Sequence, residues 1–367
     1  MYLALRNLLQ DKLRLILSMI GVALSVTLIL LLLGLRAGAL RSAVIYLENT
    51  PGSVAVMPPG ARSTGAGLGQ FISPETANAV ASTQGVARVT PVLLMLAIPD
   101  LHERKEVIRL IGYDTALGGG PWDLAQGREP RADDEVVLDR VLADRHNFKV
   151  GDTLDLAGRQ LKVVGLSNET SSWTGSSTFA RKQLVESLLL APGAASLLLV
   201  TPDEEISFSE LVERLRDLPN TNVLLKSQVM ANDRQIIANI FDQVIFLMVA
   251  AAFIVGALVV GMVIYTATIE RRGEYGILKA IGARSGVLYR VVGIQALVSA
   301  GLGALLGIAF GFAAGWLVMT ARPQFNVLLE PSAIVATLVA GLVMALLGAM
   351  IPARAVARLA PADVFRR

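Results

Sequence analysis

Long stretches of uninterrupted apolar residues alternate along the chain with stretches of mixed polarity. Four apolar runs contain no Asp, Glu, Lys or Arg: residues 15–35, 243–269, 291–321 and 331–353. A membrane-spanning helix needs roughly 20 apolar residues, and each run meets that length. One such run could be a helix buried in a soluble core, but four in one chain predict four transmembrane helices.

Residues 36–242, between the first two runs, show the shorter periods of strands and amphipathic helices. Ser73 followed by Pro74 predicts a helix start, and residues 153–165 predict a hairpin that turns at Ala157 and Gly158. Helical stalks should extend the first span through residues 37–47 and lead from Ser227 into the second span. The other predictions are strands at 53–57, 87–98, 106–111, 135–138, 196–200 and 222–225, and helices at 139–146 and 207–218. This order of elements predicts an α/β domain.

The first 14 residues mix leucines with charged and amide side chains. This pattern predicts an amphipathic helix on the inner membrane surface, the alternative being that these residues only begin the first span. The first apolar run is longer than the apolar core of a cleavable signal peptide, and no Ala-x-Ala site follows it. We therefore expect a retained signal anchor.

Charge is scarce and unevenly distributed. Charged residues make up 17% of the chain, whereas soluble domains carry about a quarter. Residues 36–242 hold 25 acidic and 20 basic side chains, and the remainder holds 5 and 13. Those basic residues gather in segments 1–14, 270–290 and 354–367, with only Arg322 between the last two runs. The positive-inside rule therefore places both termini and segment 270–290 in the cytoplasm and residues 36–242 outside.

The chain lacks the residue patterns of an enzyme or a metal site. It contains no cysteine and no Gly-Lys-Ser/Thr sequence of a phosphate-binding loop. His102 and His146 lie in unrelated segments without metal-site spacing, so we expect surface or locally bonded histidines. The charge-free spans argue against a proton relay. We predict no catalytic activity, no resident metal and no directly bound cofactor, so any work that the protein does needs energy from elsewhere.

Small residues recur every fourth position in the third apolar run. They are Ser299, Gly303, Gly307, Gly311 and Gly315. On a helix they share one face, which allows a second helix to approach closely. The alternative is the general glycine richness of membrane helices, and the sequence leaves open which helix is the neighbour.

Four parts of the sequence resemble the FtsX/MacB-type permeases of ABC transporters, and the resemblance covers nearly the whole chain. They are residues 4–8 with 12–14, 135–165, 270–283, and 352–355 with 359–364. Segment 270–283 is the most specific and resembles the cytoplasmic coupling segment of that family. The family usually has Arg-Glu-Ile-Gly where this chain has Gly-Glu-Tyr-Gly, so Gly273 and Tyr275 depart from the pattern. The layout is most similar to the DevC-like and haem-exporter branch.

The resemblance implies an α-helical membrane protein of the bacterial inner membrane, with four transmembrane helices and an extracytoplasmic α/β domain between the first two. It implies a permease that couples ATP hydrolysis by a separate ATPase to export of a hydrophobic or amphipathic substrate, through mechanical movement of the outside domain. The substrate is open among haem, lipid, peptide and drug. A second hypothesis is an FtsX-like signal transmitter that activates an extracytoplasmic partner and transports nothing.

The implied partners are two ATPase subunits, which would bind ATP and Mg, a second identical permease chain, and a membrane fusion protein or other extracytoplasmic protein; nucleic acid is not expected. Tyr275, Leu278 and Ile281 are predicted to share an apolar face that enters a groove on the ATPase. Alternatively, the charges of this segment only anchor it at lipid headgroups. The residues assigned to ATPase coupling are Glu270, Arg271, Arg272, Glu274, Tyr275, Leu278, Lys279, Ile281 and Gly282.

Overall fold

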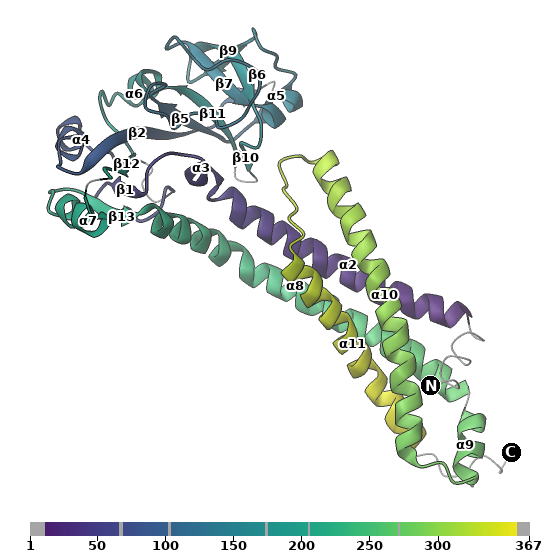
Figure 1. The fold of residues 1–367 in the computed structure, drawn as a ribbon. Helices are drawn as coiled ribbons and strands as arrows, with labels where there is room; N and C mark the ends of the chain where they lie inside the picture. Colours follow the sequence, from purple (N-terminus) through teal and green to yellow (C-terminus); the bar gives the residue numbers. More distant parts are fainter. Residues whose placement is uncertain are drawn as a thin grey trace. The chain divides into compact units, whose positions relative to one another are not determined.

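The computed structural model of this protein describes residues 12–65, 69–101, 104–172, 175–204, 206–270 and 272–357 (Figure 1). The chain divides into two units. We call residues 1–38, 240–322 and 327–367 the helical unit, and residues 39–239 with 323–326 the sheet unit. Most of the predicted surface helix at residues 1–14, and the end of the 354–367 tail, lie outside the described residues.

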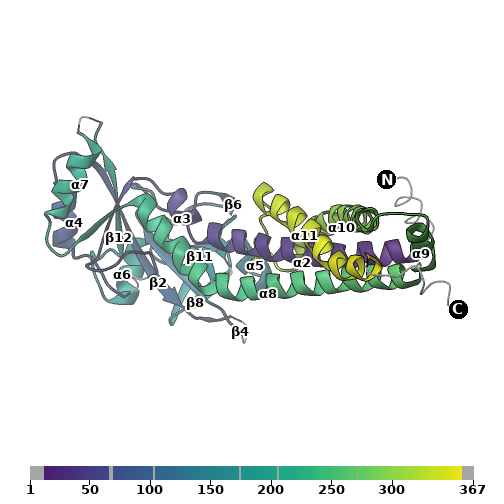
Figure 2. The ribbon, with the colours of Figure 1, turned by 90° about the horizontal axis from the view of Figure 1, so that it is seen from below.

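Long apolar helices make up the helical unit. Among the described residues, four are long and apolar enough to cross a membrane, which confirms the four predicted spans. They are α2 (Lys12–Ser42), α8 (Lys226–Glu270), α10 (Ser285–Ala321) and α11 (Pro331–Ala357), with the short α9 (Arg272–Ala280) between α8 and α10. Figure 2 shows the same elements from a second side.

Small side chains fill the interior of the helical unit. Val22 and Val26 of α2 pack with Val260 of α8, Ala304 of α10 and Ala345 of α11. Alanine and valine keep helix axes close together, which is how helices associate where lipid is as apolar as the side chains.

Two of the spans are parts of longer helices. α2 continues seven residues past the apolar run to Ser42, and after a turn the chain forms the short α3 (Ile45–Glu48). α8 starts at Lys226, well before its apolar run, and continues for 45 residues without a break. The second predicted stalk is therefore part of one continuous helix, whereas the turn before α3 interrupts the helix over residues 37–47.

The sheet unit is built on a mixed sheet with the strand order β13-β1-β12-β2-β5-β11-β7-β9-β6. β5 and β7 run parallel to β11 and β9, respectively, and the other described pairs are antiparallel. The strands are β1 (Val54–Met57), β2 (Val86–Ala97), β5 (Ile108–Tyr113), β6 (Leu124–Gly127), β7 (Glu135–Asp139), β8 (Thr153–Leu156), β9 (Arg159–Ser167), β10 (Ser171–Ser172), β11 (Gly175–Arg181), β12 (Leu197–Pro202) and β13 (Asn222–Leu225), with β3 (Asp100–Leu101) and β4 (Arg104–Lys105) forming a separate pair.

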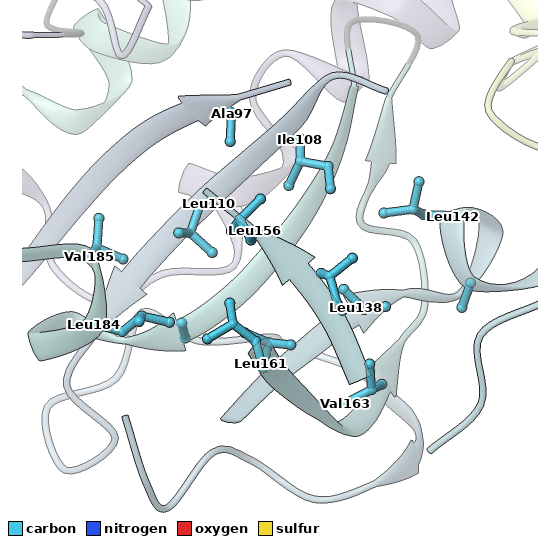
Figure 3. Close-up of a cluster of buried hydrophobic side chains, with 14 of the residues drawn as sticks. Ala97, Ile108, Leu110, Leu138, Leu142, Leu156, Leu161, Val163, Leu184 and Val185 are labelled. Carbon is cyan, nitrogen blue, oxygen red and sulfur yellow. The ribbon is translucent and has the colours of Figure 1, made fainter. Parts of the chain in front are cut away.

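Apolar side chains from both faces of this sheet are buried. One face packs under α4 (Pro74–Ala81), α5 (Arg140–His146), α6 (Lys182–Leu189) and α7 (Phe208–Arg216). Figure 3 shows part of that core, in which Leu110 and Leu138 of the sheet belong to the same cluster as Leu184 of α6. The opposite face, with Leu94 and Ile111, packs against α3 and the first turns of α8. This burial of alternate residues follows from the two-residue period of a strand.

Local sequence signals located several elements correctly. Ser73 caps α4 by accepting a hydrogen bond from the Thr76 backbone amide, and Pro74 occupies the first turn. The 153–165 hairpin forms between β8 and β9, with positive φ angles at Ala157 and Gly158. These features depend on neighbouring residues, so the sequence alone was sufficient to predict them.

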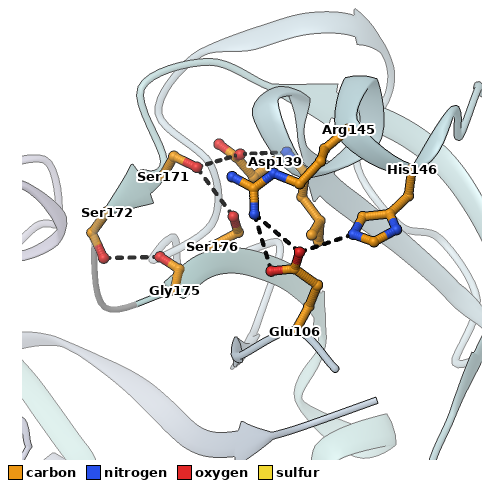
Figure 4. Close-up of polar contacts among 9 residues, drawn as sticks. Glu106, Asp139, Arg145, His146, Ser171, Ser172, Gly175 and Ser176 are labelled. Carbon is orange, nitrogen blue, oxygen red and sulfur yellow. Dashed lines mark hydrogen bonds and ion pairs between the residues drawn. The ribbon is translucent and has the colours of Figure 1, made fainter. Parts of the chain in front are cut away.

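A buried polar network joins β7 to α5 in the sheet unit (Figure 4). Asp139 is fully buried and accepts hydrogen bonds from the Leu142 amide and the Ser171 hydroxyl. Nearby, Glu106 pairs with Arg145 and hydrogen-bonds His146. His146 is therefore locally bonded, as predicted, whereas His102 lies outside the described residues.

Candidate functional site

The predicted coupling segment forms a short helix and a reversal. α9 starts at Arg272 and ends at Ala280, the Ile281 amide bonds to the Ile277 carbonyl, and α10 begins at Ser285. Gly282 has φ +97°, a conformation that strains any residue with a Cβ atom. The glycine therefore permits the sharp return of the chain from α9 to α10.

Tyr275 faces inward, contrary to the prediction that it contacts a partner. Only 3% of its surface is exposed, and it packs with the buried Leu288 and the partly buried Val291 of α10. A flat aromatic ring covers a large apolar area, so this contact fixes α9 on α10. Tyr275 therefore supports the segment from within and does not form its outer surface.

The outer apolar surface of the segment comes from two isoleucines instead. Ile277 is 54% exposed and Ile281 is 77% exposed. Glu270 and Glu274 are also exposed, and Lys279 is half-buried. Arg271 and the side chains of Arg272 and Leu278 lie outside what the structure describes. Among the described side chains of this segment, the large apolar ones open to another protein thus include Ile277, which the sequence analysis did not predict, and Ile281.

The stripe of small residues in α10 packs against α2 of the same chain. A methyl group in place of the Gly303 hydrogen would lie 2.8 Å from the Met19 carbonyl oxygen. At Gly307 it would lie 2.7 Å from the Ala23 carbonyl oxygen, and at Gly311 2.7 Å from Leu30. Contacts this short leave no room for a side chain, so glycine is what lets the two helices touch.

The ends of the stripe have different surroundings. Ser299 is buried, whereas Gly315 faces Val327 in the segment that precedes α11. At the middle, the Thr27 hydroxyl of α2 donates a hydrogen bond to the Gly307 carbonyl at 2.9 Å. This bond between α2 and α10 adds a polar link to the close packing.

An ion pair joins α2 and α8, and the sequence analysis did not predict it. Arg36 Nε and Nη2 donate to the two carboxylate oxygens of Asp242 at 2.5 and 2.8 Å. Arg36 directly follows the first apolar run and Asp242 directly precedes the second. Opposite charges at these two positions are the sequence signal from which the pair could have been predicted. A two-pronged guanidinium–carboxylate contact fixes orientation as well as distance. It holds α2 and α8 together within the helical unit.

The structure brings together no group of three His, Cys, Asp or Glu side chains that could hold a metal ion, within the residues it describes.

Arg109 is another residue that the sequence analysis did not single out. It is the single charged residue of β5, and that isolation within an apolar strand was the available signal.

Comparison with known proteins matches both parts of the chain to families. Residues 15–230 match the MacB-like periplasmic core domain, and residues 231–361 match the FtsX-like permease C-terminal region. The first match alone covers more than half of the chain.

Individual relatives extend over different lengths. An uncharacterized ABC transporter permease of Mycobacterium tuberculosis is 26% identical over 100% of this chain and 99% of its own. A macrolide export ATP-binding/permease protein MacB of Yersinia pestis is 31% identical over 33% of this chain and 19% of its own. The periplasmic region of MacB from Actinobacillus actinomycetemcomitans, a crystal structure, is 14% identical with a TM-score of 0.38, covering 51% of this chain and 94% of that one.

Proposed function

Because the chain belongs to the family of ABC transporter permeases with a MacB-like periplasmic core domain and an FtsX-like C-terminal region, we propose that it converts ATP hydrolysis by a separate ATPase into export of a hydrophobic or amphipathic substrate. Both termini and α9 would face the cytoplasm of a bacterial inner membrane, and the sheet unit would lie outside. Movement of the sheet unit would drive the substrate outward.

The continuity of α8 is the observation that carries this proposal. The helix starts at Lys226, whose ammonium group donates to the Thr50 carbonyl in the sheet unit, and it ends at Glu270, next to α9. At 1.5 Å per residue, its 45 residues extend about 68 Å. A displacement of α9 by the ATPase would thus reach the sheet unit through one unbroken helix.

The surface of α9 offers the chemistry of a docking site for the ATPase. Exposed Ile277 and Ile281 would enter an apolar groove, and the flanking charges of Glu274 and Lys279 would set orientation. Two ATPase subunits would bind ATP and Mg and engage two identical permease chains. An adaptor such as a membrane fusion protein would contact the sheet unit.

An apolar groove in the helical unit supports a hydrophobic cargo. It has a volume of about 530 Å³ and lies between α8 and α11, with Phe253, Leu258, Met262 and Leu347 among its lining residues. Such a surface suits a molecule that enters from the lipid phase.

Reconstitution tests the proposal directly. The permease and its cognate ATPase would be placed together in proteoliposomes, and ATP hydrolysis would be measured across a panel of amphipathic compounds that includes haem, lipids and peptides. We expect at least one compound class to stimulate hydrolysis and to move across the membrane only with ATP. Strong basal hydrolysis that no compound changes would instead support the FtsX-like signal transmitter.

A further inference from the structure

A cavity in the sheet unit combines an apolar entrance with a charged interior. Its volume is about 300 Å³, at the lower end of small-molecule sites. One wall is the sheet face that carries Leu94 and Leu96 of β2 and Arg109 of β5. Leu96 pairs with Arg109 in the sheet register, and Arg109 pairs with Ser177 of β11, so these side chains lie on one face of three adjacent strands.

The first turns of α8 form the opposite wall. Asp233, Ile236 and Ile237 line the cavity and follow Val229, which packs on the same sheet face, at helical spacing. Ile236 is 42% exposed and Leu96 is 50% exposed, whereas Leu94 is buried. Large apolar side chains thus stand at the entrance, which favours a ligand with an apolar body.

The interior holds one cation and one anion, and their hydrogen bonding differs. Asp233 is 6% exposed, and both its carboxylate oxygens accept hydrogen bonds from Thr64, one from the amide and one from the hydroxyl, at 2.9 Å each. Arg109 Nη2 donates to the Ser177 hydroxyl at 3.0 Å. Its Nη1 has no acceptor among the described protein groups, whereas its Nε, which also has none, is too deeply buried for a ligand to reach. The cavity therefore lacks a hydrogen-bond acceptor for Arg109.

The opposite charges of Arg109 and Asp233 indicate whether this acceptor is charged or neutral. Burial lowers the pKa of Arg109, while the charge of Asp233 opposes that effect. A guanidinium remains protonated in proteins, and Asp233 supplies its counter-charge. A carboxylate ligand would add a second negative charge to a cavity that is already balanced, at a desolvation cost. A neutral carbonyl oxygen would accept a hydrogen bond from Arg109 Nη1 and leave the charge of the cavity unchanged.

We propose that this cavity binds a small neutral amphiphile, an acyl ester or acyl amide, with its carbonyl oxygen on Arg109 Nη1 and its chain between Leu96 and Ile236. The site goes beyond the proposed export function, because binding there does not require that the ligand be transported. A ligand bound against Asp233, Ile236 and Ile237 would contact α8, the helix that leads to α9.

Photolabelling of the full-length protein in lipid nanodiscs tests this site. The probes are decanoyl methyl ester and N-methyl decanamide, each with a diazirine in the chain, and a diazirine alkane without a carbonyl. Mass spectrometry would locate the labels. We expect the two carbonyl probes to label residues 92–98 and 229–239 at least tenfold more than the alkane does, and the stronger of the two identifies an ester or an amide ligand. Equal labelling by the alkane would overturn the proposal.

Variants separate a binding role of Arg109 from a structural one. Arg109→Met should reduce labelling of these two segments about tenfold or more, the loss expected for a hydrogen bond to a charged donor. Labelling of the membrane spans by partitioned probe should stay constant and serves as the internal reference. Arg88→Met, at an exposed arginine on the neighbouring strand β2, is the matched control and should label like the unmodified protein. Unchanged labelling of Arg109→Met would reject the assignment.

A variant that removes one charge keeps the test decisive even if Arg109→Met fails to fold. Asp233→Asn retains an acceptor and a donor for Thr64 but removes the counter-charge of Arg109. Excess decanoate, a weak competitor against the unmodified protein, should then compete about tenfold better relative to the methyl ester. If the ratio of the two competitors does not change, the charge-balance argument is wrong. This outcome bears only on the cavity, since ATP hydrolysis is measured separately.

Discussion

Tyr275 of α9 packs against Leu288 of α10, and the two side chains are 3% and 1% exposed. The ring that the sequence placed on the outer surface of the coupling segment therefore holds that segment to the membrane helix that follows it. Ile277 and Ile281 are large apolar side chains that the structure shows exposed on the segment.

Replacing both isoleucines should weaken ATPase binding. In Ile277→Ser with Ile281→Ser, we expect co-purification of the cognate ATPase to fall about tenfold or more, because two exposed apolar anchors are lost. Membrane insertion should be unchanged. Leu190→Ser, at a leucine of the sheet unit that is 88% exposed, controls for loss of surface apolarity. Undiminished co-purification of the double variant would remove this surface from the proposed contact.

Tyr275 should act on ATPase binding through the position of α9. Tyr275→Ala would remove the buried ring and cost about 3 kcal/mol of local stability, by analogy with other aromatic truncations. The expected signature is faster proteolysis within residues 272–284 together with weaker ATPase binding. Tyr275→Phe keeps the ring and should protect the segment as the unmodified protein does. Weaker binding without faster proteolysis would point to direct contact instead.

The contact between α10 and α2 predicts opposite effects of one substitution at two glycines. Gly307→Ala would place a methyl group 2.7 Å from the Ala23 carbonyl oxygen and should destabilise the protein by about 1–3 kcal/mol. Gly301→Ala on the same helix meets nothing within 4 Å and should be neutral or slightly stabilising. Thermal unfolding in detergent compares the two. Equal midpoints would mean that α2 does not pack on this face.

The pair of Arg36 and Asp242 should show coupling in a double-mutant cycle. Both side chains are more than one third exposed, so we expect a coupling energy of about 1 kcal/mol or less. Arg36→Asp alone should destabilise the helical unit, since it would face Asp242 and the nearby charge of Glu330. Adding Asp242→Arg should restore part of the loss. If the exchanged pair is no more stable than Arg36→Asp, the ion pair contributes nothing measurable.

The sheet unit should lose stability in acid through Glu135. Hydrogen bonds from Arg128, and from the Arg131 and Ala132 amides, lower the pKa of Glu135 from 4.5 to about 2, against the opposing effect of burial. A depressed folded-state pKa stabilises the fold fully above the unfolded value, so the contribution is lost as pH falls from about 4.5 towards 2.

Glu135→Gln measures that contribution. It should cost about 1–3 kcal/mol at neutral pH, and the difference from the unmodified protein should shrink as pH falls through this window. Hydrogen exchange of the β7 and β9 amides, compared between the two proteins at each pH, provides the readout. A difference that stays constant down to pH 2 would contradict the assignment.

Features set by neighbouring residues could be predicted from the sequence. The four spans follow from apolar runs of sufficient length, the 153–165 hairpin from its alternation and turn, and the α4 start from Ser73 and Pro74. Each of these depends on interactions within one segment, or on the uniform requirement that backbone polar groups in lipid be satisfied within a helix. The family resemblance rested on similarly local motifs.

Contacts between distant segments were decided only by the tertiary structure. The helical period of α9 would allow Tyr275 to face either a partner protein or Leu288. In the structure Tyr275 faces Leu288, because α10 covers the ring. The glycine stripe indicated a close neighbour but not α2, and neither β5 nor α8 by itself indicates that Arg109 and Asp233 share a cavity. Sequence periodicity fixes which side chains share a face, whereas the partner of that face depends on how the whole chain packs.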